Sequence, residues 1–327
     1  MTKLRELVAI IKDKASQGKA AILSDRATLS LLRVTTHHSV AAPSHKHLSS
    51  LLSIGDGSRA TCSVLIELLM DRLQTTHNSA VALKCLIVVH HIIKYGSFIL
   101  QDQLSIYPAT GGRNYLNLSN FRDDSSPITW ELSSWVRWYA QYIEQLLCTS
   151  RVLGFFLGSD PSSQNRERES QEERITGLLN ADLLRETESL LALVEEICAR
   201  PDPAHMNGNK LVEEIAKLVG EDWISITSEV SVRVSEFRER LGCLSFGEAV
   251  ELMCDLKRLE ECKERMMLVA QSLWDLVSQV KEKAGKNVYR EENSRLVRRH
   301  RASESDRFAS SIFNSGDLLR FPSGRLM

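Results

Sequence analysis

A short stretch near the N-terminus gathers side chains that could bind phosphate. Arg33 ends one predicted helix, and Ser44, His45, Lys46 and His47 cluster where the next helix begins. The free N–H groups at a helix N-terminus attract anions, and a guanidinium can hold a phosphate through two parallel hydrogen bonds. These residue types therefore indicate a site for a phosphate-bearing ligand. A solvated basic loop is the alternative interpretation, because short basic clusters are common.

Metal and enzyme chemistry have little support in the sequence. The four histidines of residues 37–47 have no thiolate or carboxylate at zinc-ligand spacing. His90 and His91 interrupt an apolar stretch, where hydrogen bonding between core helices is a simpler role than a metal or catalytic pair. The chain contains no Walker-type loop, GxSxG elbow or HExxH string. We therefore predict a protein that is not an enzyme and needs no cofactor or metal; an all-helical, histidine-dependent hydrolase is the enzymatic alternative.

The charge distribution suggests one surface that faces anions. The net charge is −1, yet residues 1–50 contain eight Lys or Arg against three acidic residues, a local excess of +5. Such asymmetry favours a single anionic partner surface over a general polyanion binder, so we expect no nucleic acid. The seven cysteines form no CxxC pair and indicate reduced core thiols. Without a signal peptide or an apolar span, the chain should be cytoplasmic and meet membranes only at their surface.

The apolar periodicity is helical almost throughout. Only 16 glycines and 7 prolines are present, which favours long helices over a many-stranded fold. We predict an all-α protein, a stacked helical array that continues into a bundle of longer helices, with a loop over 105–129. Helices are predicted around 4–11, 20–34, 43–52, 58–75, 79–95, 130–156, 172–199, 208–241 and 246–284.

Five aromatic residues share the helix predicted over 130–156. They follow helical spacing, which favours packing in the core over a cofactor-binding role. These residues are Trp130, Trp135, Trp138, Tyr139 and Tyr142.

The domain boundaries follow from changes in composition. One folded domain is expected over 1–284, with the stacked helices in 1–158, a polar, charged linker at 159–171 and the longer helices in 172–284. The apolar stripe then fades into Arg, Ser, Glu and Asn, so 285–327 is predicted to be a mostly disordered tail.

Three stretches resemble, in order and spacing, the ANTH domains of clathrin assembly proteins. Residues 33–48 are similar to the phosphoinositide loop of that family, 84–96 to its helix signature with His-His and Tyr-Gly, and 117–123 to its loop signature. The opening residues 3–16 resemble the plant branch. The resemblance implies a right-handed helical superhelix that binds phosphatidylinositol 4,5-bisphosphate on the cytosolic leaflet, and a tail that engages clathrin or its adaptors.

The lipid motif departs from the family pattern of a Lys, nine residues, and then Lys-x-Lys-His. Arg33 takes the first lysine position with one extra residue in the loop, and Ser44 replaces the second lysine. Lys46 and His47 match the last two positions, and His45 compensates in part for the missing charge. Since each cation near an anionic membrane contributes on the order of 1 kcal/mol, we expect weaker or less selective headgroup binding.

The N-terminal stripe has two interpretations. Leu4, Leu7, Val8 and Ile11, backed by Lys3 and neighbouring cations, fit an interfacial helix that inserts beside the headgroup. A helix packed on the domain itself is the alternative, and the resemblance favours membrane contact.

The tail contains Asp317, Leu318 and Leu319, which are similar to the short clathrin-binding motifs of the family, whereas NPF and DPF strings are absent. The implied function is an adaptor that links the cytosolic leaflet to the clathrin coat in endocytosis or vesicle budding. The implied partners are phosphatidylinositol 4,5-bisphosphate membranes, clathrin, adaptor proteins and a vesicle SNARE. The implied location of the monomer is peripheral, at coated pits of the plasma membrane, coated vesicles and the Golgi. The alternative is a protein-binding helical scaffold that uses 208–284, with weak or lost lipid binding.

Overall fold

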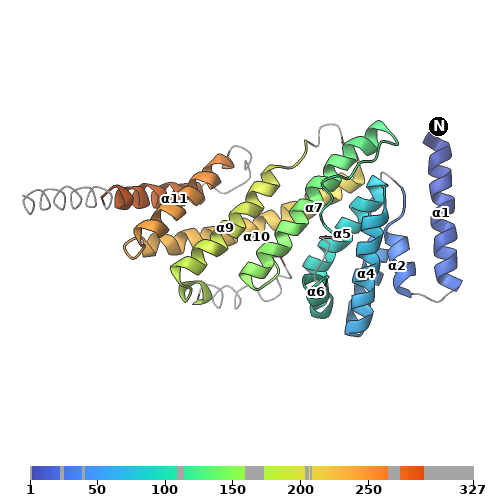
Figure 1. Ribbon diagram of the computed structural model, residues 1–327, viewed down its shortest axis with the longest axis horizontal. Coiled ribbons are helices and arrows are strands. Elements are labelled where there is room, and N and C mark those ends of the chain that lie inside the picture. Colours follow the sequence, from blue (N-terminus) through green and yellow to red (C-terminus); the bar gives the residue numbers. More distant parts are fainter. Residues whose placement is uncertain are drawn as a thin grey trace, which may run out of the picture.

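The computed structural model describes residues 2–22, 26–38, 41–108, 114–158, 173–202, 206, 208–263 and 273–290. Within these ranges all regular structure is helical and no strand occurs, which confirms the predicted all-α fold. Figure 1 shows an elongated array in which α1 lies at one end and α11 lies towards the other.

The first half of the chain is built from short and medium helices. They are α1 (Thr2–Ile22), α2 (Arg26–Val34), α3 (His45–Leu52), the 3-10 helix η1 (Ser53–Asp56), α4 (Arg59–Thr75), α5 (Ser79–Tyr95), α6 (Phe98–Ser105) and α7 (Pro127–Leu153).

The second half contains longer helices that pack on α7 and on each other. They are α9 (Asn180–Cys198), α10 (Lys210–Arg240) and α11 (Phe246–Glu261), followed by a helix over 273–290.

Helix α5 lies at the centre of the first half. Its apolar run is buried on nearly all sides because α4, α6, α7 and α10 pack around it. The Asn78 side chain accepts a hydrogen bond from the Val81 amide and caps its start. The buried carboxylate of Asp123, from the loop before α7, accepts a second one from the Ser79 amide at 2.8 Å. Burial favours a raised pKa for Asp123, but hydrogen bonds from Ser125 and Ser79 hold that pKa below its ordinary value.

A buried polar network ties α5, α7 and α10 together. Asp222 accepts hydrogen bonds at 2.6 Å each from His90 Nε2, Lys94 Nζ and the Tyr142 hydroxyl. The other ring nitrogen of His90 lies 2.7 Å from the Tyr139 hydroxyl. Burial alone favours a raised pKa for Asp222, but His90 and Lys94 hold that pKa below its ordinary value. His90 therefore makes the interhelical hydrogen bonds predicted from the sequence.

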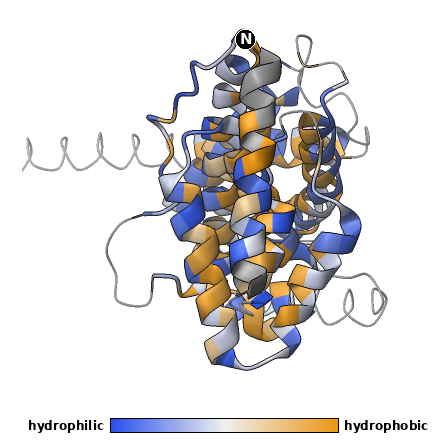
Figure 2. Cartoon of the chain, turned by 90° about the vertical axis from the view of Figure 1, so that its right-hand side faces the viewer, coloured by the Kyte–Doolittle hydropathy of each residue, from blue (hydrophilic) through white to orange (hydrophobic). Residues whose placement is uncertain are grey.

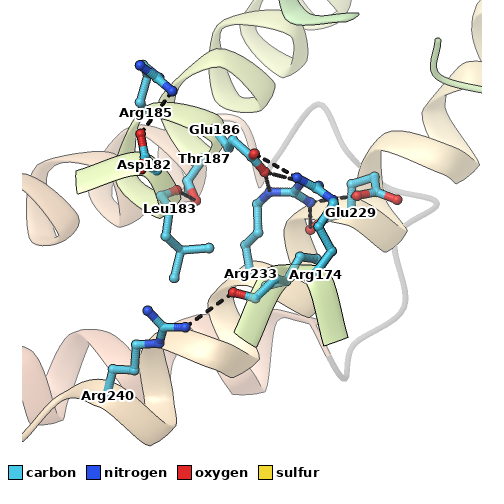
Figure 3. Close-up of polar contacts among 10 residues, drawn as sticks. Arg174, Asp182, Leu183, Arg185, Glu186, Thr187, Glu229, Arg233 and Arg240 are labelled. Carbon is cyan, nitrogen blue, oxygen red and sulfur yellow. Dashed lines mark hydrogen bonds and ion pairs between the residues drawn. The ribbon is translucent and has the colours of Figure 1, made fainter. Parts of the chain in front are cut away.

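A second ionic network joins α9 and α10, as Figure 3 shows. The fully buried Arg233 lies 2.6 Å from Glu186 on α9 and 2.6 Å from Glu229 on its own helix. Arg174 completes the cluster at 3.0 Å from Glu186. Because each buried charge has a partner of opposite sign, the network fixes how α9 packs on α10.

Several predicted helix ends were wrong. The helix predicted over 20–34 is two helices, because α1 ends at Ile22 and α2 begins at Arg26. Helix α7 begins at Pro127 because Ser126 and Thr129 form a capping box around a proline at the first helical position.

The helix predicted over 246–284 was also wrong. α11 ends at Glu261, and the helix over 273–290 packs back against it through an ion pair between Lys281 and Glu260. Val277, Val280 and Ala284 become fully buried in this arrangement. A single straight helix would leave that apolar stripe in solvent, so burial favours the turn.

The start of the predicted tail needs correction as well. Residues 285–290 continue the helix that begins at residue 273. They also contact the folded domain, since Asn287 donates a hydrogen bond to the Leu241 carbonyl and Gly285 lies against Met253. The remaining predicted tail, 291–327, and the predicted linker lie outside the described residues.

Candidate anion-binding site

The five predicted phosphate-binding residues share the connection between α2 and α3. Arg33 is exposed in the last turn of α2, and Ser44 is the N-cap of α3. His45 and Lys46 are exposed at the first helical positions, while His47 is partly buried. The Ser44 side chain makes no capping hydrogen bond, so its hydroxyl remains available to a ligand. The structure thus places three exposed polar or charged side chains at a helix N-terminus, where backbone N–H groups also favour anions.

The loop that carries this cluster is anchored by a buried lysine. Lys84 of α5 donates hydrogen bonds to the Thr36 carbonyl at 2.9 Å, the Thr36 hydroxyl at 3.0 Å and the His38 carbonyl at 2.9 Å. Burial lowers the pKa of Lys84 to about 8, and the negative charge of Asp13 opposes that shift in part. Lys84 therefore orders the loop from beneath.

Two further contacts hold the same segment. Arg72 of α4 donates to the Thr35 hydroxyl at 2.6 Å and to the Thr35 carbonyl at 2.7 Å. Asp13 of α1 accepts from the His37 amide at 2.8 Å and lies 2.6 Å from His37 Nδ1. The loop is thus fixed to α1, α4 and α5, which limits the freedom that ligand binding would have to remove.

Sequence reasoning missed the anchoring roles of Asp13, Arg72 and Lys84. A lysine at the start of an apolar run is a usable signal for Lys84, because a buried ammonium must find oxygen partners. Nothing local distinguishes Asp13 or Arg72 from solvated surface charges.

Helix α1 turns Val8 and Ile11 away from the domain. Gln17 donates to the Leu32 carbonyl of α2, and Asp13 contacts His37 in the loop that follows α2. Val8 and Ile11 are 46% and 65% exposed, so these two residues do not pack on the domain. Figure 2 looks onto this outward side of α1. Lys3, Leu4 and Leu7 were also predicted to contact the membrane, and their side chains lie outside the part of the chain that the structure describes.

A model of the ANTH domain matches residues 29–262 of this chain. The chain belongs to the ANTH-domain family. Three proteins of Arabidopsis thaliana, each named "Putative clathrin assembly protein", are similar over most of their length. The first is 47% identical over an alignment that covers 99% of this chain and 94% of the relative's length. The second is 34% identical over 86% of both chains. The third is 30% identical over 86% of this chain and the full length of the relative.

Two expectations from the sequence, on enzymatic activity and on membrane-spanning helices, can now be compared with the family and the fold. ANTH-domain clathrin assembly proteins are non-enzymatic scaffolds, which confirms that this chain is not an enzyme. Among the described helices, none is both long and apolar enough to cross a bilayer.

The second histidine of the ANTH helix signature has a different environment from the first. Burial, together with His90 and Lys217, lowers the pKa of His91 to about 4. His91 is therefore neutral at physiological pH and adds no charge beside the connection between α2 and α3. Its Nε2 lies 3.5 Å from the nearest carboxylate oxygen, on Glu214, and no described group of three or more His, Cys, Asp or Glu could hold a metal ion.

The aromatic set of α7 divides into two groups. Trp135, Trp138, Tyr139 and Tyr142 are buried, as predicted. Trp130 is 56% exposed, so the prediction that it packs in the core was wrong. The first turn of α7 turns this side of the helix to solvent.

Two adjoining cavities of about 290 and 250 Å³ share Tyr107, Pro108 and Tyr115. Their lining residues all lie between Ser63 and Arg151 and include none of the predicted phosphate-binding residues. Neither cavity involves 208–284, the segment that a protein-binding scaffold would use.

Proposed function

We propose that this ANTH-domain chain is a clathrin assembly adaptor that binds phosphoinositide headgroups at the connection between α2 and α3. The observation that carries the proposal is that Arg33 is exposed at the end of α2 and Ser44, His45 and Lys46 are exposed at the start of α3. Lys84 holds the connecting segment through Thr36 and His38. The names of the Arabidopsis relatives support a role in clathrin assembly.

Each side chain has a defined part in headgroup binding. Arg33 can hold one phosphate group through two parallel hydrogen bonds, and Lys46 supplies a point charge. The N-terminus of α3 and the Ser44 hydroxyl donate further hydrogen bonds, and the rings of His45 and His47 can donate N–H groups. Because Ser44 carries no charge, affinity for phosphatidylinositol 4,5-bisphosphate is weaker than a lysine there would give.

Helix α1 extends the membrane contact. Val8 and Ile11 can insert between headgroups, while the exposed Lys12 and Lys14 attract anionic lipid. The adaptor is then peripheral on the cytosolic leaflet, at plasma-membrane coated pits, on coated vesicles and at the Golgi.

Clathrin binding is assigned to Asp317, Leu318 and Leu319, which lie outside the described residues. The same three residue types recur at 182–184, but Leu183 and Leu184 are buried in α9 and Asp182 pairs with Arg185. Only the 317–319 copy is therefore a candidate for a groove on clathrin. Its test is recovery of the clathrin terminal domain on the immobilised full chain and on a Leu318→Ala/Leu319→Ala variant.

The lipid site is tested by vesicle flotation at physiological salt, with and without phosphatidylinositol 4,5-bisphosphate. An Arg33→Ala/Lys46→Ala variant should lose lipid-dependent flotation. A Lys257→Ala/Lys283→Ala variant is the control, because both lysines are exposed and lie on the last two helices, far from α2 and α3 (Figure 1). Equal flotation of all three proteins would overturn the assigned site, and no flotation of the intact chain would favour the protein-scaffold alternative.

A further inference from the structure

The first turn of α7 presents two large apolar side chains to solvent. Ile128 is 54% exposed and Trp130 is 56% exposed, while Thr129 between them is buried. In the described part of the chain, Trp130 is the most exposed of the tryptophans, since Trp135, Trp138 and Trp274 are buried and Trp223 is half-buried. Two adjacent exposed apolar side chains on one turn are available for contact with another apolar phase.

The turn that carries this pair is held in place by several hydrogen bonds. The Thr129 amide donates to the Ser126 hydroxyl at 3.2 Å, and the Ser126 amide donates to the Thr129 hydroxyl at 2.9 Å. Just before it, the Asp123 amide donates to Ser133 on α7, and the Asp123 carboxylate accepts from Ser79 on α5. The exposure of Ile128 therefore belongs to an ordered helix start.

The start of α7 and the N-terminal end of α1 lie at the same end of the molecule. Figure 1 places them both towards the right-hand end of the view. The N-terminal half of α1 contributes its own exposed apolar residues, namely Val8, Ile10 and Ile11. Apolar side chains from two separate elements thus occur at one end of the fold.

The charges on α1 and beside the turn of α7 indicate what kind of surface this end of the molecule contacts. Lys12, Lys14 and Lys19 are exposed on α1 and complement an anionic surface. Beside the turn of α7, one exposed cation, Arg122, stands against two anions, exposed Asp124 and half-buried Glu131, so the turn contributes apolar contact and no attraction of its own to an anionic surface. Tryptophan is the residue type that concentrates where acyl chains meet headgroups. A cationic helix beside a tryptophan-bearing tip fits an anionic bilayer better than a protein groove.

We propose that Ile128 and Trp130 form a second membrane-contacting tip, which enters the headgroup region of an anionic leaflet beside α1. The inference rests on the proposed function, because it requires that the chain bind membranes, and it adds which further face turns towards the lipid. The tip fixes the orientation of the ANTH domain on the bilayer, since a rigid domain that touches the leaflet through α1 and α7 cannot rotate about either contact alone.

Fluorescence quenching by brominated lipid tests the proposal. The intact chain is added to vesicles of phosphatidylcholine brominated high on the acyl chains, phosphatidylserine and phosphatidylinositol 4,5-bisphosphate, and bound protein is measured by co-sedimentation. We expect quenching that Trp130→Phe largely removes and that Trp223→Phe retains. An Ile128→Ser/Trp130→Ser variant should partition about tenfold more weakly, because part of the apolar area of two large side chains no longer enters the bilayer.

The outcomes separate the two proposals. Co-sedimentation with quenching that does not depend on Trp130 overturns the tip and leaves the adaptor function intact; that is also the result expected if the tip docks a protein. Failure of the intact chain to co-sediment overturns lipid binding itself, and the tip with it.

Discussion

Replacing Lys84 with methionine removes the ammonium group that anchors the loop between α2 and α3 and keeps the side chain's length. Two opposing terms decide the effect on stability. The Thr36 and His38 carbonyls lose their donor, at about 1–3 kcal/mol for each unsatisfied buried group. In return the fold no longer holds a charge whose pKa has fallen from 10.5 to about 8, a cost of about 3 kcal/mol. The terms largely cancel, so we expect a global loss of only about 1 kcal/mol, with a much larger loss of headgroup binding.

The lowered pKa of Lys84 also makes the stability of the fold depend on pH in a predictable direction. Between pH 8 and 10.5 the unfolded chain still binds the Lys84 proton while the folded chain has released it, so the stability of the intact chain should rise relative to the Lys84→Met variant. Urea unfolding followed by circular dichroism at several pH values measures this difference, and vesicle flotation measures binding. Lys257→Met is the exposed-lysine control. Wild-type flotation by Lys84→Met would refute the anchoring role, and a stability difference that is flat with pH would show that the pKa of Lys84 is not lowered in the fold.

Three further predictions concern buried charge and the tail. Asp222→Asn should destabilise the fold by about 3 kcal/mol in urea unfolding because it breaks a buried ionic network, whereas Asp182→Asn, which breaks only a surface pair with Arg185, should change little; equal effects would contradict the network's importance. Burial raises the pKa of Asp255 to about 6, so its ionised form opposes folding. Asp255→Asn should therefore stabilise the chain by about 1–2 kcal/mol at pH 7.5, with the gain gone near pH 4, and a gain independent of pH would show another cause. Leu318→Ala/Leu319→Ala should lower recovery of the clathrin terminal domain while leaving flotation unchanged, and undiminished recovery would remove the motif.

Local periodicity was sufficient for the all-α class and for most helices of the first half. α5 has a continuous apolar run and α7 a regular aromatic stripe, and both were predicted within a few residues. The division of 246–284 into α11 and a following helix was not predictable in this way. Val277 and Ala284 continue the same helical spacing, and only their packing back towards α11 shows that the chain turns.

The sequence could indicate a candidate site only where its residues lie close together in the chain, and could not reveal contacts between distant residues. Arg33 and Lys46 lie close enough in the chain to be recognised as one cluster. The contact of Lys84 with Thr36 spans 48 residues, and that of His90 with Asp222 spans 132, so no local pattern could reveal either. Trp130 shares the spacing of the buried aromatic residues, and its exposure depends on where α7 begins.

Vesicle partitioning at matched surface charge tests the central claim most directly. One vesicle set contains phosphatidylinositol 4,5-bisphosphate, and the other contains enough phosphatidylserine to give the same charge. If the α2–α3 connection recognises the headgroup, the intact chain prefers the first set and Arg33→Ala/Lys46→Ala lowers that partitioning by about 30-fold, as expected for the loss of two cations at about 1 kcal/mol each. Equal partitioning onto both sets, unchanged in the variant, would contradict headgroup recognition at this site.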